Sequence, residues 1–348
     1  GALQVGTHHL TWTRQPELAR EGECDNSFSV TSSRVPSKFR VVAIFRGGMS
    51  EVVLAKQSRS GSPYIFKRAK NSEHLAQKKS FQAAIVNELR ILKSLQQQSE
   101  STHPNIVRLI SDELVDGEWI MLEYVPDGSL DKECTPLNLS PPDILSIALQ
   151  SISAVAFLHD KGVIHRDIKP HNILYFHGDD GEIVVKLTDF GLATTSSQDC
   201  ARFAGTQKYA APEAFQNRVS AESDVWSWAC GIAHLATGVL PYSGDCKLVP
   251  YSDELRDAGL AIGLPLNFVG LLLSCFANDP RQRPTARDLK ERLLRLPMFE
   301  IDDGIHDFEE QPTEEEYQRH LIDEATTALV TTAGRNVAPL GVVHLPHC

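Results

Sequence analysis

The hydrophobic pattern of the chain changes once, at Asp127-Gly128, and this change constrains the fold more than any other feature. Before it, short apolar runs of strand length alternate with turn residues, and one longer stretch has helical spacing. After it, most apolar residues recur at helical spacing. A strand-rich part with one helix, followed by a helix-rich part, predicts an α+β fold of two unequal lobes joined near residues 124–127.

The strand-rich part begins at Phe39, after a polar stretch that we expect to be a flexible arm over residues 1–38. Residues 76–97 carry apolar side chains on one helical face and predict an amphipathic helix. The expected strands lie at residues 39–42, 52–55, 63–67, 106–111 and 119–124.

In the second part, residues 141–161 predict a long helix that ends at Gly162, because glycine commonly terminates helices. The apolar stretch 268–277 is too short to span a bilayer and predicts a core helix. It belongs to the helix expected at 266–277, and two further helices are expected at 221–237 and 286–295. The expected body is residues 39–298, with a small lobe at 39–125 and a larger lobe at 126–298.

Charge is concentrated near the C-terminus. The net charge is −11, and residues 299–324 contain eleven acidic residues and one arginine, a net of −10. The body is nearly neutral, so we expect neither a nucleic-acid partner nor a membrane partner. The tail at 299–348 is either solvated and disordered, or residues 313–330 form a short helix that docks on the body or on a partner.

The cysteines indicate the cellular compartment. Seven are scattered along the chain with no Cys-x-x-Cys pair, which favours a reducing compartment, cytoplasmic or nuclear. The N-terminus shows no basic segment followed by an apolar run, so we expect no secretory signal, although the chain begins with Gly rather than Met.

Two polar motifs carry the chemistry. Residues 165–172 read His-Arg-Asp-Ile-Lys-Pro-His-Asn, and Asp189-Phe190-Gly191 follows 22 residues after Asp167. Motif, order and spacing resemble the eukaryotic-type protein kinase family, and the resemblance covers about residues 39–298. It implies a small lobe with an antiparallel β-sheet and one helix, and a larger, mainly helical lobe.

The resemblance also implies catalytic roles and the cofactors ATP and Mg²⁺. Asp167 is expected to be the catalytic base that accepts the proton of the substrate hydroxyl, and Asn172 and Asp189 to bind Mg²⁺. Lys67, on the strand predicted at 63–67, is expected to contact the α- and β-phosphates. Glu88, 21 residues later on the predicted helix, is expected to be its ion-pair partner.

The loop that would cover the phosphates departs from the family pattern Gly-x-Gly-x-x-Gly. Only the middle glycine position is filled, because Phe45 and Ser50 replace the outer glycines, and Ile65 stands where alanine is usual over the adenine. We therefore expect a working nucleotide site of low affinity. The residues expected around ATP are Phe45, Arg46, Gly47, Gly48, Met49, Ser50, Glu51, Val52, Lys67, Glu123, Val125 and Leu174.

Two features favour Ser/Thr hydroxyls of proteins as acceptors. Lys169 stands two residues after the expected base, where serine/threonine kinases place a lysine. Thr206 and Tyr209 lie in Gly-Thr-Gln-Lys-Tyr-Ala-Ala-Pro-Glu at 205–213, which resembles the peptide-docking segment of the family.

Further residues are expected to be structural. Glu213 should pair with Arg283, and Asp224 should accept hydrogen bonds from the backbone of the catalytic loop. A stack of apolar groups is expected from Leu92, Leu109, His165 and Phe190.

Regulation and substrate preference also depart from common patterns. The commonest phosphoacceptor position, three residues before Gly205, is Arg202, so we expect activity without a phosphate there. Acidic residues that would select arginine in a substrate are replaced by His171, Lys208 and His234, so no strong arginine selection is expected. The remaining candidate acceptors are Thr194, Thr195, Ser196 and Ser197, and Asp199 would supply a fixed charge.

Two alternatives remain open. A pseudokinase or kinase-shaped scaffold with weak nucleotide binding would fit Phe45, Ser50 and Ile65, although it would have no need for the complete catalytic set. A small-molecule kinase would share the lobe design but would not need the segment 205–213.

Overall fold

The structure is a computed structural model. It describes residues 27–31, 36–46, 48–97, 102–111, 118–131, 139–178, 180–195, 203–238, 240 and 252–296, and the following account concerns these residues. Contacts group Gly1–Met298 into one compact unit. The predicted acidic tail and residues 1–26 of the predicted arm lie outside the described residues.

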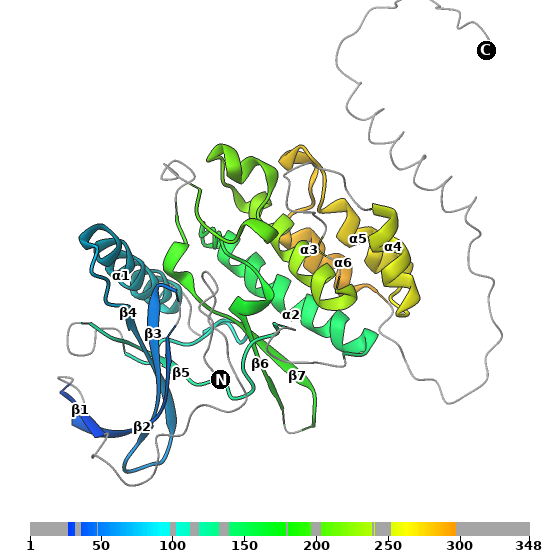
Figure 1. The fold of residues 1–348 in the computed structure, drawn as a ribbon. Coiled ribbons are helices and arrows are strands. Elements are labelled where there is room, and N and C mark those ends of the chain that lie inside the picture. The colour runs from blue at the N-terminus through cyan, green and yellow to red at the C-terminus, as the bar shows by residue number, and fades with distance from the viewer. Residues whose placement is uncertain are drawn as a thin grey trace, which may run out of the picture. The chain divides into compact units, whose positions relative to one another are not determined.

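A five-stranded antiparallel sheet forms the N-terminal part, with its strands in chain order (Figure 1). Helix α1 (Leu75–Gln97) contacts β4 of this sheet and carries its buried residues on one face. The strands are β1 (Ser27–Thr31), β2 (Pro36–Arg46), β3 (Ser50–Gln57), β4 (Pro63–Ala69) and β5 (Ile120–Glu123). The predicted α+β class is therefore confirmed.

Two predictions about the sheet were wrong. Residues 27–31, expected within a flexible arm, form β1, because polar Ser and Thr alternate there with Phe28 and Val30 at strand period. Residues 106–111, expected as a strand, make only isolated bridges. Side chains interrupt that ladder, since Glu123 Oε1 accepts from the Arg108 N–H and Gln96 Oε1 from the Leu109 N–H.

The C-terminal part is mainly helical (Figure 1). Its helices are α2 (Pro141–Asp160), α3 (Ala221–Thr237), α4 (Ser252–Ala261), α5 (Leu266–Ser274) and α6 (Ala286–Leu294). A hairpin of β6 (Ile173–His177) and β7 (Ile183–Leu187) separates α2 from α3. Neither α4 nor this hairpin was predicted, whereas α3 begins and ends at the predicted residues.

Helix α2 is the central helix of this part. Ser140 and Asp143 form a capping box at its start, and Gly162 follows its end with φ of 69°. By length and hydropathy it is the one described helix that could cross a membrane, yet more than half of its apolar window is buried inside the domain. Burial of this kind is typical of a core helix.

The expected stack of apolar groups joins the two parts. Leu92, Leu109, His165 and Phe190 are all buried. The rings of His165 and Phe190 lie edge to face, with centroids 4.9 Å apart. This core holds the segment after β7, which contains Asp189, against α1.

Candidate active site

Lys67 links the sheet, α1 and the segment after β7. Its Nζ lies 2.7 Å from Oε2 of Glu88 and 2.9 Å from Oδ1 of Asp189. Lys67 stands at the centre of β4, opposite Val52 of β3, so neighbouring strands hold its backbone on both sides. The ion pair expected between Lys67 and Glu88 is therefore present, and Asp189 joins it.

The electrostatics of this cluster keep the lysine charged. Burial alone would lower the pKa of Lys67, but the carboxylates of Asp189 and Glu88 outweigh it and raise the pKa above its ordinary value. Burial would raise the pKa of Asp189, but the Lys67 ammonium holds it below its usual range. The cluster thus presents a cation and an ionised carboxylate at neutral pH.

Asp224 of α3 holds the backbone of the loop at 165–172. Asp224 is almost fully buried, and its carboxylate accepts from the His165 N–H at 2.7 Å and from the Arg166 N–H at 2.9 Å. Arg166 has φ of 71°, an unusual conformation for a residue with a side chain. Two charge-assisted hydrogen bonds to one carboxylate hold this turn. The bonds expected from Asp224 are thus present.

Asp167 lies at the centre of a hydrogen-bond network. Oδ2 accepts from Lys169 Nζ at 2.8 Å and from Asn172 Nδ2 at 3.1 Å. Oδ1 accepts from the Thr206 hydroxyl at 2.8 Å, and Thr206 accepts in turn from Lys169 at 2.6 Å. A lysine and a threonine from two segments therefore fix both oxygens of this carboxylate.

Gly205 allows this approach. Its φ is 116°, and a Cβ there would lie 2.5 Å from the backbone oxygen of Arg166. No side chain fits, so only glycine lets the segment that carries Thr206 contact the loop at 165–172.

Two oxygen-bearing side chains of the site, those of Asn172 and Asp189, are suitable ligands for Mg²⁺. Asn172 uses its Nδ2 to bond Asp167, which leaves its amide oxygen for a cation, and Asp189 supplies a carboxylate. Among the residues that the structure describes, no group of three or more His, Cys, Asp or Glu could hold a metal ion. Two oxygen ligands are nevertheless typical for Mg²⁺, which takes its other ligands from phosphates and water.

A cavity of about 290 Å³ lies between these groups. Its lining includes the expected site residues Gly48, Met49, Ser50, Lys67, Glu88, Asp167, Lys169, Asn172, Asp189 and Thr206. Phe45 instead lies in β2 opposite Val52 and packs on the core. Gly47 and the side chain of Arg46 lie outside the described residues.

This cavity is not lined by five other residues expected around ATP, namely Glu51, Val52, Glu123, Val125 and Leu174. Val52, Val125 and Leu174 are buried apolar residues, and Ile65 is buried as well. The Glu123 carboxylate accepts from Lys186 Nζ at 2.9 Å and from the Arg108 N–H at 2.7 Å.

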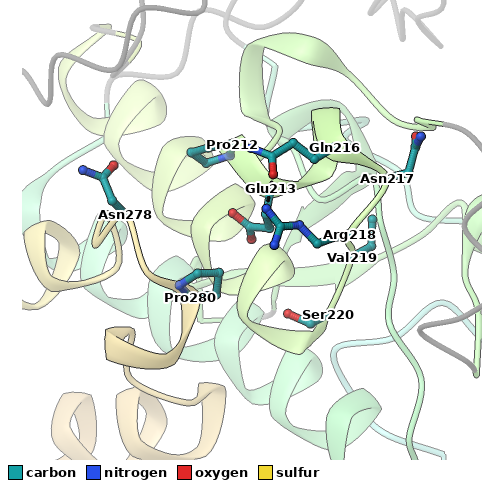
Figure 2. Close-up of a pocket in the computed structure, with 9 residues that line it drawn as sticks. All are labelled: Pro212, Glu213, Gln216, Asn217, Arg218, Val219, Ser220, Asn278 and Pro280. Carbon is teal, nitrogen blue, oxygen red and sulfur yellow. Dashed lines mark hydrogen bonds between the residues drawn. The ribbon is translucent and has the colours of Figure 1, made fainter.

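Glu213 and Arg283 form the expected buried ion pair. Two bonds of 2.7 and 2.9 Å join them, and Ser223 donates to Glu213 at 2.7 Å. A pocket of about 450 Å³ adjoins this pair, with Glu213 in its wall and Asn278 and Pro280 on the opposite side (Figure 2). The pair joins the turn η4 (Pro212–Gln216), which carries Glu213, to Arg283, the residue after the turn η5 (Pro280–Gln282).

The substrate-side residues are also placed. Tyr209 is buried, with its hydroxyl 3.0 Å from Nδ1 of His234 on α3. His171 Nε2 lies 2.6 Å from Asp131 Oδ2, and Lys208 is exposed.

Some candidate phosphoacceptors can be placed as well. Thr194 is buried, and its backbone bridges to Ile164, whereas Thr195 is exposed. Ser196, Ser197, Asp199 and Arg202 lie outside the described residues.

Sequence patterns did not indicate two of the contacts. Asn87 of α1 bonds the backbone that follows Asp189, and Phe203 stacks on Phe215. Asn87 carried a weak signal, since asparagine is unfavourable inside a helix and often marks a side-chain-to-backbone bond. The phenylalanine pair carried none.

Comparison with known proteins agrees with this geometry. A model of the protein kinase domain matches residues 40–294. The chain is 34% identical over 225 residues to serine/threonine-protein kinase pak-2 of Caenorhabditis elegans, covering 62% of this chain and 40% of that protein. It is 29% identical over 275 residues to mitogen-activated protein kinase kinase kinase A of Dictyostelium discoideum, covering 75% and 28%. It is 35% identical over 215 residues to MAP3K epsilon protein kinase 1 of Arabidopsis thaliana, covering 59% and 15%.

The chain spans less than half the length of each of these relatives. The domain match nevertheless covers most of the chain and contains every residue of the cluster around Lys67 and Asp167. The chain belongs to the protein kinase family.

Proposed function

We propose that this protein transfers the γ-phosphate of ATP to Ser or Thr hydroxyls of protein substrates. The observation that carries the proposal is the network at Asp167, whose carboxylate is held by Lys169 and Thr206 beside Lys67 and Asp189. Phosphoryl transfer requires positioning and charge stabilisation more than covalent chemistry, and these groups supply both.

Each residue has a proposed role. Lys67 contacts the α- and β-phosphates, with Glu88 holding its ammonium in place. Asp189 and the amide oxygen of Asn172 hold Mg²⁺, which neutralises charge on the phosphates when it is bound. Asp167 orients the attacking hydroxyl and accepts its proton, and Lys169 stabilises charge on the transferred group.

The hydroxyl of Thr206 supports the choice of acceptor. It already donates to Asp167 and accepts from Lys169, which are the interactions that a Ser or Thr hydroxyl of a substrate would make. The buried Tyr209 and the Glu213–Arg283 pair support the segment next to it as a platform for a peptide.

An assay with radiolabelled ATP, Mg²⁺ and generic protein substrates tests the proposal, followed by phosphoamino-acid analysis. Labelled serine and threonine are expected. Asp167→Asn and Lys67→Met should each lower kcat at least about 100-fold. Two matched exposed controls, Asp180→Asn and Lys56→Met, should leave it unchanged.

Two results would contradict the proposal. Nucleotide binding without transfer to any substrate would indicate a pseudokinase. Label on small molecules alone would indicate a different acceptor class.

A further inference from the structure

The side-chain amide of Asn87 lies against the turn that follows the expected metal ligand. Its Nδ2 is 2.8 Å from the backbone oxygen of Ala193, 3.1 Å from that of Gly191 and 3.3 Å from that of Phe190. These carbonyls belong to or follow the turn η2 (Phe190–Leu192), directly after Asp189. One helix side chain therefore contacts three of the four carbonyls from Phe190 to Ala193.

The orientation of this amide is set from the other side. Its Oδ1 accepts a hydrogen bond of 2.9 Å from the guanidinium of Arg90, an exposed residue on the same face of α1. Because a carboxamide has one acceptor end and one donor end, this bond turns the two N–H donors toward the carbonyls. The donors are thus aimed at the turn.

The turn also packs closely on α1. A Cβ at Gly191 would lie 3.3 Å from the Cβ of Ala84, one helical turn before Glu88. The small residues Ala84 and Gly191 bring the backbone within reach of the short Asn87 side chain. A longer side chain at either position would push the turn away.

Asn87 and its neighbour Glu88 hold the same segment at two places. Glu88 bonds Lys67, which bonds the side chain of Asp189. Asn87 bonds the backbone just after Asp189 directly. Asp189 itself has φ of 66°, a left-handed conformation that a non-glycine residue keeps only when its surroundings hold it.

We propose that Asn87 is a positioning residue that fixes the metal-binding carboxylate of Asp189 by holding the backbone behind it against α1. The proposal rests on the function proposed above, because it assigns Asp189 to Mg²⁺. Donation of N–H groups, rather than the volume of the side chain, is the property that matters.

Substitutions at Asn87 separate donation from volume. Asn87→Asp is nearly isosteric but sets a carboxylate against three carbonyls, so it should be the most damaging. Asn87→Ala leaves the carbonyls to water and should be intermediate, and Asn87→Gln keeps both donors on a longer arm and should be the mildest. Gln82→Ala and Lys79→Ala, at exposed positions of α1, serve as controls.

Two measurements are made on the full chain. Hydrogen–deuterium exchange in peptides covering 189–195 should rise in the order Asn87→Gln, Asn87→Ala, Asn87→Asp. The Mg²⁺ concentration needed for half-maximal binding of a fluorescent ATP analogue should rise in the same order, by at least about tenfold for Asn87→Asp. Both controls should stay near the wild type.

The outcomes are distinct. If Asn87→Asp stays closest to the wild type and Asn87→Ala is worst, the side chain acts by volume and the proposal is overturned. Unchanged exchange at 189–195 in all three variants overturns it as well. If exchange and Mg²⁺ dependence follow the expected order but the wild type transfers no phosphate to Ser or Thr, the proposed function fails while the role of Asn87 stands.

Discussion

The rings of Phe203 and Phe215 lie parallel, with centroids 4.9 Å apart and 10° between their planes. Phe203 stands three residues before Thr206, and Phe215 belongs to η4. Phe203 also packs against Ala210, Ala214 and Val219. The segment that brings Thr206 to Asp167 is thus anchored by an apolar contact near the place where many kinases carry a phosphate.

Removing this anchor should weaken catalysis. Phe203→Ala is expected to lower kcat/KM for a peptide substrate about three- to tenfold, because an aromatic pair contributes roughly 0.5–1.5 kcal/mol beyond its buried area. Phe203→Tyr keeps the ring and should retain most activity. Wild-type kinetics in Phe203→Ala would show that the stack does not support Thr206.

Dephosphorylation should not abolish activity. The Arg166 guanidinium lies 3.5 Å from the Leu192 carbonyl, and Asn87 bonds the Ala193 carbonyl. Phe203 stacks on Phe215 further along the same segment. These contacts hold the segment without a phosphate. Recombinant protein treated with a phosphatase, and verified by intact mass, should keep most of its turnover. Negligible turnover that returns after phosphorylation would contradict this expectation.

Shortening Ile65 should improve ATP binding. Ile65 is buried on β4 opposite Leu54 and Leu122. The resemblance to protein kinases led us to expect the adenine beside it. Ile65→Val should lower the KM for ATP at least about twofold, while the lost methylene costs about 0.5–1.5 kcal/mol of folding stability. Steady-state kinetics and thermal denaturation separate the two effects. A higher KM for ATP would mean that Ile65 serves only the core.

Peptide selection should show no dominant arginine. His171 is paired with Asp131, and His234 contacts Tyr209, so neither position offers a carboxylate to a basic residue. A positional peptide array checks this, and His234→Glu should raise selection for arginine. Strong arginine selection by the wild type would refute the prediction.

The Glu213–Arg283 pair should stabilise the folded state at neutral pH and lose this contribution in acid. Burial would raise the pKa of Glu213, but hydrogen bonds from Arg283 and Ser223 lower it below the ordinary value. A carboxyl with a depressed folded pKa stabilises above its unfolded pKa, about 4.3, and loses that contribution as pH falls through the folded pKa.

Glu213→Gln should therefore be less stable at pH 7 by about 3–5 kcal/mol, since it leaves a buried guanidinium without its partner. Urea unfolding at several pH values should show this gap closing below about pH 4. A gap independent of pH would contradict the assignment.

Much of the site was predictable because local sequence fixes it. Lys67 and Glu88 lie on a predicted strand and a predicted helix, and α3 begins and ends at the predicted residues. The motifs at 165–172 and 189–191 were found from their residue order and spacing. The strand expected at 106–111 did not form because the side chains of Glu123 and Gln96 take the N–H groups of Arg108 and Leu109. β1 was missed because its alternation is short and polar.

Contacts between distant segments had a weak sequence signal or none. Phe203 and Phe215 are ordinary apolar residues until the chain brings them together, and Asn87 differs from other helix residues only by its poor helix propensity. Pairing of this kind depends on tertiary packing.

Asn87 and Glu88 are neighbours on α1, so one helix carries both contacts to the segment around Asp189. Successive residues of a helix point about 100° apart, so one rotation about the helix axis moves both side chains at once. A rotation of α1 would therefore change both the Lys67–Glu88 contact and the bond from Asn87 to the backbone after Asp189. We expect a displacement of this one helix to disturb the side chain and the backbone of the Asp189 segment together.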